Sequence, residues 1–364
     1  MKALVTGATG LVGGAIVDAL LAQGHSVQAL VRPTARVDGL ILRGVNLIIG
    51  DLNNEESLRQ AVQGVDVVFH CAALLGFGAS EADMEWVNVV GTELALAASR
   101  AARVSRFVHL SSVAVYGSHD PPIGEDAATR PTSIYGRTKL AAEEAVWQAE
   151  REGLPVTILR PAVIYGPGDR YFLPALLKAM RLPVVPLPDG GDALVELVYV
   201  SDVADAALQA ATRTAAVGQA YNLTDGRPTT VRDIVETFGL LTGYAPRIMD
   251  ISAARLQHIA SLAHEAVAPI NPRLAYVFGS DVVANLGRDT HYDLRKAERE
   301  LSYAPRVGLY EGLRRALAAD APDALRGANP NFPLAVGGLL VLAGLIGSVW
   351  LRRVFRRPRG AAMN

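Results

Sequence analysis

The chain has 364 residues, with 35 lysines and arginines against 36 aspartates and glutamates. Half of the residues are hydrophobic, which excludes wholesale disorder, and the net charge of −1 argues against a nucleic-acid-binding protein, which needs a basic face. The single cysteine excludes an intramolecular disulfide and a cysteine-based zinc site, and we predict no bound metal.

Short apolar runs alternate with stretches at helical spacing over the first 165 residues. The apolar runs lie at 1–5, 26–31, 45–49, 65–71, 106–111 and 155–160, and the helical stretches at 13–22, 57–62, 84–102 and 135–152. The first run is too short for a signal peptide and is better explained as a buried strand. This alternation predicts an α/β fold, in which a parallel sheet is covered by helices on both faces.

The rhythm changes after residue 165, where prolines become frequent and the expected elements shorten. We predict a smaller C-terminal substrate-binding region over 166–325, built at the edge of the sheet where open α/β sheets bind ligands. A linker at 326–333 then leads to Leu334–Leu351, which is 18 residues long and carries no charge.

The C-terminal hydrophobic segment precedes a basic tail, 352–364, with five arginines and no acid, so the rest of the chain has a net charge of −6. A helix of this length spans roughly 27 Å, against about 30 Å for a bilayer core. We interpret 334–351 as a membrane-anchoring helix, with a buried C-terminal helix as the alternative.

The arginines favour a cytoplasmic tail, but a simple span would then place residues 1–330 outside without a signal for export. A helix lying in the cytoplasmic leaflet avoids this conflict. We therefore expect a membrane-associated protein with its main domain on the cytoplasmic side, and leave open whether the helix spans the bilayer.

A glycine-rich turn follows the first expected strand, in Thr6-Gly7-Ala8-Thr9-Gly10-Leu11-Val12-Gly13. Gly7 permits the tight turn, Gly10 lets the backbone approach a pyrophosphate, and Gly13 lets helix and strand pack closely. The pyrophosphate would meet free N–H groups at the helix N-terminus. We predict a Rossmann-type dinucleotide site that includes Thr6, Gly7, Thr9, Gly10, Leu11 and Val12.

Tyr135 and Lys139 lie four residues apart on one face of an expected helix. A phenol, with a pKa of about 10, is a poor acid or base at neutral pH unless its anion is stabilised. A lysine ammonium one turn away provides that stabilisation.

With these motifs, the segment Leu110-Ser111-Ser112-Val113-Ala114-Val115-Tyr116-Gly117 makes residues 1–318 resemble the extended short-chain dehydrogenase/reductase family, within the NAD-dependent epimerase/dehydratase superfamily. The resemblance implies that Ser112, rather than Ser111, holds the substrate oxygen beside Tyr135. It also implies that Lys139 lowers the pKa of Tyr135 and holds the nicotinamide ribose, while Asn88 supports the site.

The resemblance implies further cofactor contacts. Asp51 and Leu52 follow the third expected strand, with Asp51 near the adenine, and Cys71, Ala72 and Ala73 form a small-residue surface against the cofactor. We interpret Cys71 as a small buried hydrophobe rather than a reactive thiol. Pro161 and Val163 would lie near the nicotinamide, and for Arg160 a structural ion pair is the alternative to a site role.

The second expected strand ends at Val31-Arg32, where NAD-selective sites carry an acid. Because no carboxylate repels a 2′-phosphate there and a guanidinium can pair with one, we predict NADP as cofactor, with NAD as the alternative.

Sugar-nucleotide members of the family usually carry an arginine three residues before Val198-Tyr199-Val200, and here that position is Val195. Losing a cation from a diphosphate site is costly, and the aliphatic residue resembles the 3β-hydroxysteroid dehydrogenase branch, as do 271–278 and 287–293. The candidate substrate contacts are Leu75, Phe77, Ser112, Tyr171 and Val195.

We therefore predict an NAD(P)-dependent oxidoreductase acting on a secondary alcohol or ketone, a 3β-hydroxysteroid or another apolar lipid-like substrate. The alternatives are a nucleotide-sugar epimerase or dehydratase, or a dihydroflavonol-reductase-like reductase of small carbonyls, and then a non-catalytic nucleotide-binding scaffold. The family is often dimeric, and a homodimer would use the helices at 84–102 and 135–152.

Overall fold

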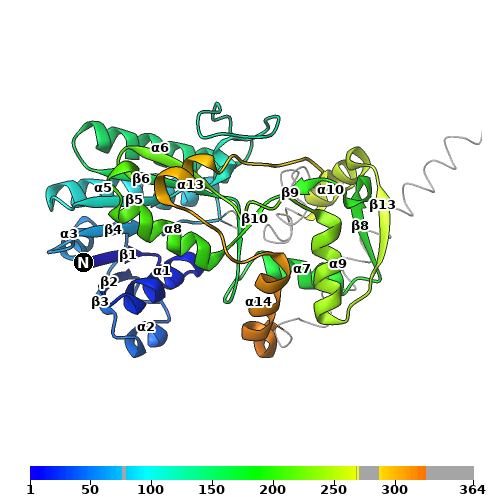
Figure 1. Cartoon of the computed structure of the whole chain (residues 1–364), viewed down its shortest axis with the longest axis horizontal. Helices are drawn as coiled ribbons and strands as arrows, with labels where there is room; N and C mark the ends of the chain where they lie inside the picture. The colour runs from blue at the N-terminus through cyan, green and yellow to red at the C-terminus, as the bar shows by residue number, and fades with distance from the viewer. Residues whose placement is uncertain (76–78, 268, 270–286, 325–364) are drawn as a thin grey trace, which may run out of the picture.

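The computed structural model describes the chain except for residues 76–78, 268, 270–286 and 325–364 (Figure 1). Its centre is a parallel seven-stranded sheet in the order β11-β6-β5-β4-β1-β2-β3. The strands are β1 Lys2–Thr6, β2 Ser26–Val31, β3 Asn46–Ile49, β4 Val67–His70, β5 Arg106–Leu110, β6 Val156–Pro161 and β11 Gln219–Leu223. The predicted doubly wound fold is thereby confirmed.

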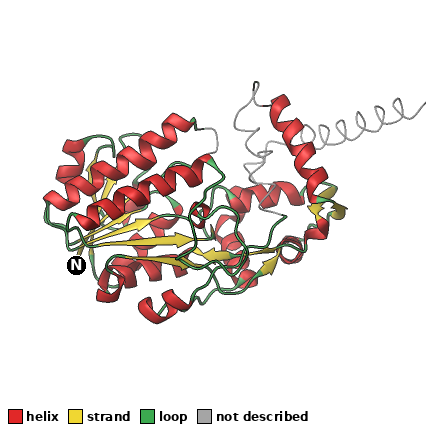
Figure 2. Ribbon diagram, turned by 90° about the horizontal axis from the view of Figure 1, so that it is seen from above, coloured by secondary structure: helices red, strands yellow, loops and turns green. Residues whose placement is uncertain are grey.

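Helices cover both faces of this sheet, as the view from above shows (Figure 2). One core cluster holds residues of α1 (Leu11–Ala22) and α8 (Val200–Thr212), and a second holds residues of α3 (Glu55–Ala61), α5 (Gly91–Ala101) and α6 (Ile134–Arg151). Central side chains such as Val5, Phe69 and Phe107 are fully buried, which is why the strands are apolar along their whole length.

Strand order reverses on either side of β1, because β2 lies on one side of it and β4 on the other. The loops that follow β1 and β4 therefore diverge at the carboxyl edge of the sheet. Open α/β sheets bind nucleotides at such a point. The glycine-rich turn directly follows β1, so the topology positions it at this switch point.

The expected helix at 84–102 is three consecutive segments. These are α4 (Glu81–Glu85), a π-helical turn at Trp86–Val90, and α5. The π-turn buries Asn88, and such turns are frequent at functional sites. A short helix that we did not predict, α2 (Asp38–Leu42), links β2 to β3.

The chain after residue 165 forms a smaller lobe and also returns to the sheet, because α8 and β11 lie beyond that position. The lobe contains three two-stranded pairs, β10-β7, β12-β9 and β13-β8. The described α-helices and strands from residue 163 onward, apart from α8 and β11, are β7 Val163–Tyr165, α7 Phe172–Met180, β8 Val184–Pro188, β9 Leu194–Val195, β10 Leu197–Tyr199, β12 Thr229–Thr230, α9 Val231–Thr242, β13 Arg247–Ile251, α10 Ala253–Val267, α13 Arg295–Leu301 and α14 Leu309–Ala324. Of these, α13 packs on β11 and α8 rather than in the lobe. The division at residue 165 stays a prediction.

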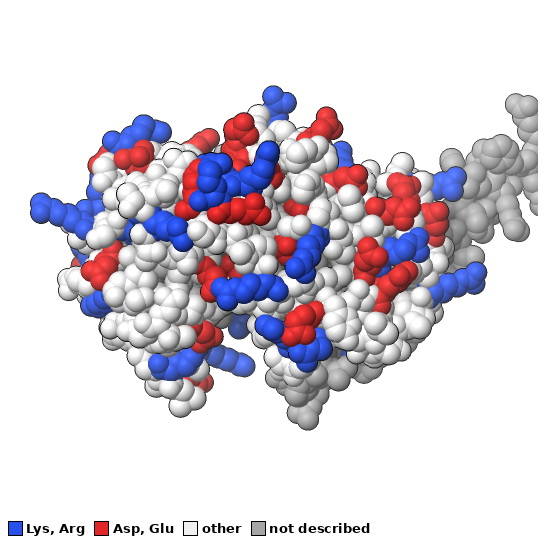
Figure 3. Space-filling view, viewed as in Figure 1, with Lys and Arg blue, Asp and Glu red and all other residues white. Residues whose placement is uncertain are grey.

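Acidic and basic side chains are interspersed over the face of the molecule shown in Figure 3. No described helix is both long enough and apolar enough to cross a bilayer. The proposed anchor at 334–351, its linker and the basic tail lie outside the described residues, as do Phe77 and the segment 271–278. A C-terminal hydrophobic helix is therefore not part of the fold as described.

Candidate active site

The glycine-rich turn places the start of α1 against the end of β4. Gly7 has a φ of +70°, and a Cβ there would lie 2.8 Å from the backbone nitrogen of Ala72. A Cβ on Gly13 would lie 2.2 Å from the carbonyl oxygen of Gly7. Both positions therefore need glycine for close backbone packing.

The N-terminus of α1 offers backbone donors to an anion. Gly10 is the N-cap residue and provides no side-chain cap, and Thr9 and Gly10 are exposed. Leu11 and Val12 pack their side chains toward the core, so any cofactor contact they make is through the backbone. These features fit a diphosphate held at a helix N-terminus.

The end of β2 also matches the expected cofactor side of the site. Val31 is buried in the core, whereas Arg32 is exposed. After β3, Asp51 is exposed and its Oδ1 accepts from the backbone N–H of Asn53 at 3.1 Å, while Leu52 is buried. Arg32 and Asp51 are therefore both exposed at the positions where the family resemblance places the contacts with the adenosine.

The loop after β4 consists of Cys71, Ala72 and Ala73, small residues that leave room beside the glycine turn. Burial raises the pKa of the Cys71 thiol to about 12, so it stays protonated at neutral pH. Asn88 holds the chain directly after this loop, because its side chain accepts a hydrogen bond from Leu74 N at 2.7 Å and donates one to Leu74 O at 3.0 Å.

The helix α6 carries Tyr135 in its first turn and Lys139 one turn later, and Lys139 reaches the end of β5. Ser133 caps the helix by accepting from the backbone N–H of Gly136 at 3.0 Å. A Cβ on Gly136 would lie 2.6 Å from the carbonyl oxygen of Ala114, so a glycine is needed where α6 meets the turn that follows Ser112. No sequence motif pointed to this role for Gly136.

Lys139 is almost completely buried, and its Nζ donates to the carbonyl oxygen of Leu110 at 2.6 Å. Burial lowers the pKa of Lys139 to about 8, and the nearby Glu143 opposes this shift by favouring the charged form. The ammonium is therefore held at the end of β5, one helical turn from Tyr135.

The two candidate serines have different environments. Ser111 is buried, and its hydroxyl donates to Glu143 Oε1 at 2.5 Å. Ser112 is partly exposed, and its Oγ accepts from the backbone N–H of Ala114 at 3.2 Å, which leaves its hydroxyl proton for another acceptor. This difference favours Ser112 as the serine that contacts a substrate.

Sequence reasoning missed a buried polar network behind the catalytic face. Glu143 forms an ion pair with Arg160 through Nε at 3.0 Å and Nη2 at 2.6 Å. Arg160 Nη1 also donates to the hydroxyl of Tyr116 at 2.9 Å, and that hydroxyl donates to Asn222. Arg160 therefore has the structural role that we kept as the alternative. The spacing Tyr135, Lys139, Glu143 was the available signal, since the three share a helix face.

The remaining predicted residues are divided between the sheet and the smaller lobe. Pro161 is buried at the end of β6, and Val163 is 47% exposed in β7. Tyr171 is 44% exposed at the start of α7, and Leu75 is partly buried. Val195 packs against the core in β9, with Glu196 beside it held by His291 and the backbone of Tyr292.

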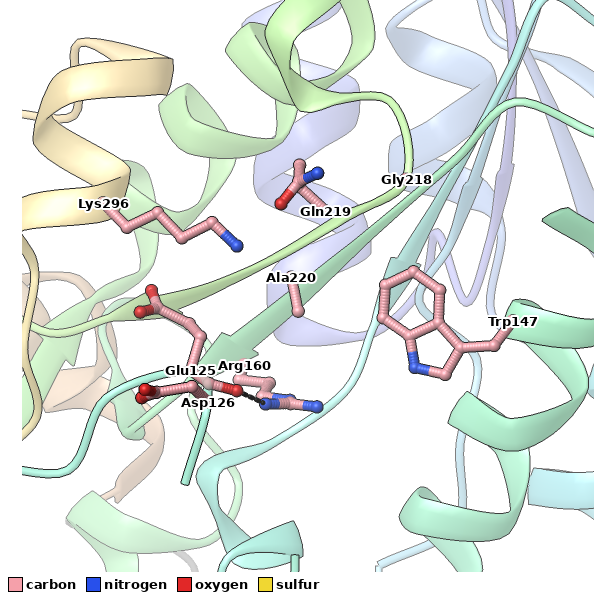
Figure 4. A pocket seen from close by; sticks show the side chains of 8 residues that line it. All are labelled: Glu125, Asp126, Trp147, Arg160, Gly218, Gln219, Ala220 and Lys296. Atoms are coloured by element: carbon pink, nitrogen blue, oxygen red, sulfur yellow. Dashed lines mark hydrogen bonds between the residues drawn. The ribbon is translucent and has the colours of Figure 1, made fainter. Parts of the chain in front are cut away.

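A separate pocket of about 420 Å³ lies at the open edge of β11, as Figure 4 shows. Trp147 and Lys296 flank it, and Arg160 lies at its base with a hydrogen bond to the carbonyl oxygen of Glu125. None of the predicted cofactor or catalytic residues lines this pocket. It is therefore not the nucleotide site.

The doubly wound sheet with a glycine turn at its switch point defines a Rossmann-class dinucleotide-binding protein. The chain belongs to the NAD dependent epimerase/dehydratase family, whose model matches residues 3–224. The family predicted from the motifs is thereby confirmed, and the chain is an enzyme of a family that uses NAD(P).

Several relatives are similar over most of their length. The chain is 36% identical to a 4-hydroxy-2-methyl-3-oxo-4-farnesyl-3,4-dihydroquinoline-1-oxide ketoreductase of Stigmatella aurantiaca, over 91% of this chain and 97% of that one. It is 32% identical to a 2-alkyl-3-oxoalkanoate reductase of Stenotrophomonas maltophilia, over 88% and 100%. It is also 32% identical to sterol demethylase protein B of Methylococcus capsulatus, over 84% and 94%.

Among solved structures, MoeE5 in complex with UDP-glucuronic acid and NAD is 29% identical, with a TM-score of 0.70 over 88% of this chain and 99% of that one. The similar proteins thus include named reductases, a sterol demethylase protein and a structure that holds a sugar nucleotide. The similarity does not identify the substrate.

Proposed function

We propose that the protein is an NADP-preferring oxidoreductase that interconverts a ketone and a secondary alcohol on an apolar molecule bearing an alkyl, prenyl or steroid skeleton. The observation that carries the proposal is the buried Lys139 ammonium, which is held at the end of β5 one helical turn from Tyr135, while Ser112, two residues after that strand, is partly exposed. Relatives named for farnesylated, alkylated and sterol substrates support the apolar substrate class.

Tyr135, Ser112 and Lys139 each have a separate role in the proposed reaction. A nicotinamide cofactor, held through the glycine-rich turn, would supply the hydride for reduction or accept it in oxidation. Tyr135 gives a proton to the carbonyl oxygen during reduction or takes it from the alcohol during oxidation. Ser112 donates a hydrogen bond to the same oxygen, and Lys139 stabilises the Tyr135 phenolate by its charge.

Val195 supports an apolar substrate over a sugar nucleotide. It places an aliphatic side chain where sugar-nucleotide relatives usually carry an arginine, and Glu196 next to it adds a buried carboxylate. Burial raises the pKa of Glu196. A carboxylate at this position is an unfavourable neighbour for a negatively charged diphosphate. We propose that Val195, Leu75 and Tyr171 contact the apolar substrate.

Arg32 supports NADP. Its exposed guanidinium follows β2 and can pair bidentately with a 2′-phosphate, and no carboxylate stands at Val31 to hold the ribose of NAD.

The test is a screen of NADPH consumption with a 2-alkyl-3-oxoalkanoate, a 3-ketosteroid and a prenylated ketone, alongside UDP-glucuronic acid followed by NMR for epimerisation. We expect turnover with at least one apolar ketone and its loss in Tyr135→Phe. Tyr310→Phe is the matched control, since Tyr310 is exposed on α14. Conversion of the UDP-sugar alone refutes the proposed substrate class, and NADPH binding without any turnover supports the scaffold alternative.

We also propose that 334–351, with the arginines of 352–364, holds the enzyme on a bilayer where apolar substrates partition. The main domain would then face the cytoplasm. Flotation with anionic vesicles tests this, because removal of residues 329–364 should abolish binding. Unchanged flotation of the shortened chain refutes it. A homodimer through α5 and α6 stays a prediction.

A further inference from the structure

Two buried histidines lie side by side beneath the candidate active site. His70 in β4 pairs in register with His109 in β5, and their ring centroids are 5.6 Å apart with planes 20° from parallel. Both are at most 1% exposed. Imidazoles at such positions need defined hydrogen-bond partners, and the proposed reaction assigns neither of them a role.

The partners of His70 fix its proton. Thr92 Oγ1 donates to Asn88 O at 2.7 Å, so it accepts from His70 Nε2–H at 3.0 Å. The other ring nitrogen, Nδ1, then accepts from the hydroxyl of Thr6 at 3.0 Å. His70 is therefore neutral, and both of its ring nitrogens are hydrogen-bonded, one to Thr6 at the end of β1 and one to Thr92 in α5.

His109 faces Lys139 instead. Its Nε2 lies 3.5 Å from Lys139 Nζ, which also donates to Leu110 O at 2.6 Å. An ammonium only donates, so a hydrogen bond between the two requires a lone pair on Nε2 and places the imidazole proton on Nδ1. Among the described residues, Nδ1 has no hydrogen-bond partner.

We propose that His109 is a positioning residue for the reaction: its neutral Nε2 and the carbonyl oxygen of Leu110 take two of the three Lys139 protons and hold the ammonium for Tyr135. This inference rests on the proposed function for its meaning, but its geometry can be tested without a substrate.

Burial and the charge of Lys139 keep His109 neutral. Burial lowers the pKa of His109 well below the usual value, and the positive charge of Lys139 acts in the same direction, while His70 beside it is neutral. Glu143 on α6 favours the charged form of Lys139 itself, whereas Cys71, after β4, stays protonated and uncharged near neutral pH. Protonated His109 would place two cations in one dry site.

A proton relay through the two rings is the less consistent alternative. Both nitrogens of His70 are occupied by threonine hydroxyls, and Nδ1 of His109 leads to no described acceptor. The pair therefore gives no hydrogen-bonded path away from Lys139, and a fixed acceptor is the role that the contacts support.

Histidine NMR on the full chain tests the tautomer directly. The protein is labelled with ¹⁵N-histidine, and the His109 signals are assigned by their loss in His109→Gln. We expect a neutral ring protonated on Nδ1 from about pH 6 to pH 8 and a changed signal in Lys139→Met. An Nε2-protonated or charged ring, or no response to Lys139→Met, overturns the proposal whether or not any ketone turns over.

The pH profile of ketone reduction tests the consequence for the reaction. His109→Leu removes the acceptor, so we expect the alkaline limb to move down by about one pH unit, a tenfold change in the ratio of charged to neutral Lys139. His109→Gln supplies an amide oxygen and should restore the limb. Phe107→Leu, a cavity-forming change two residues away on β5, should leave it in place; equal shifts in both leucine variants indicate packing alone and refute the proposal.

Discussion

Removing one partner of the buried ion pair between Glu143 and Arg160 should destabilise the fold strongly. Glu143 is 1% exposed and accepts hydrogen bonds from Ser111 and from two nitrogens of Arg160. Glu143→Leu leaves the guanidinium buried without its counter-ion, which typically costs about 3–5 kcal/mol. Glu144→Leu, an exposed position one residue along α6, should stay within about 0.5 kcal/mol of wild type.

The coupling between the two partners is the sharper measurement. Arg160→Met should also destabilise the fold, because it leaves the Glu143 carboxylate buried and uncompensated, but the double variant Glu143→Leu/Arg160→Met removes both charges together. Since replacing a buried pair by apolar side chains is often close to neutral, we expect the double variant to unfold at higher urea than either single variant, with a coupling of at least about 2 kcal/mol. Urea unfolding followed by circular dichroism measures all four proteins. Additive losses in the double variant would refute the argument that the two charges stabilise each other.

Four further outcomes follow from the site. Tyr135→Phe should lower kcat about a hundredfold to ten-thousandfold while leaving the Kd for NADPH, measured by fluorescence, unchanged; a normal kcat removes Tyr135 from the chemistry. Arg32→Asp should raise the KM for NADPH about tenfold or more and reduce the preference over NADH, and an unchanged ratio of the two KM values shows that Arg32 does not contact the 2′-phosphate. Gly13→Ala should weaken cofactor binding, because its Cβ would lie 2.2 Å from a backbone oxygen, whereas in the adjacent Gly14→Ala the nearest atom is 3.6 Å away and binding should persist. Burial lowers the pKa of Lys139 to about 8, so the charged form is lost as the pH rises through that value, and the rate of reduction should fall on the alkaline side of about pH 8; a rate that stays level to about pH 10 contradicts this assignment.

The sequence predicted the sheet well because its strands are buried on both faces. Six of the seven strands nearly coincide with a predicted apolar run, as in β5, where Arg106–Leu110 was expected within 106–111, whereas β11, with the sequence QAYNL, was not predicted. The π-turn at Trp86–Val90 was not predicted, because an extra residue in one turn hardly disturbs a hydrophobic pattern that continues at helical spacing on both sides. The helix α2 was not predicted, because its apolar residues Ile41 and Leu42 are exposed and form no amphipathic pattern.

The candidate site was predictable where its residues lie on one element, and unpredictable where they meet across elements. Tyr135 and Lys139 are neighbours by helix geometry alone, and the glycines of the first turn are neighbours by sequence. The contact of Lys139 with His109, and that of Glu143 with Arg160, join residues 30 and 17 positions apart through the packing of α6 on the sheet. No spacing rule encodes such a contact, because it depends on how the helix is set against the strand.

One face of α6 couples the chemistry to the stability of the fold. Tyr135, Lys139 and Glu143 follow each other at intervals of four, and the carboxylate of Glu143 favours the charged form of Lys139 against the effect of burial. Arg160 holds that carboxylate in place from β6. A change at Arg160 therefore alters the field at Lys139 without touching the cofactor side of the site. Variants behind α6 should change both unfolding and the alkaline limb of the reaction, whereas variants at Tyr135 should change the rate alone.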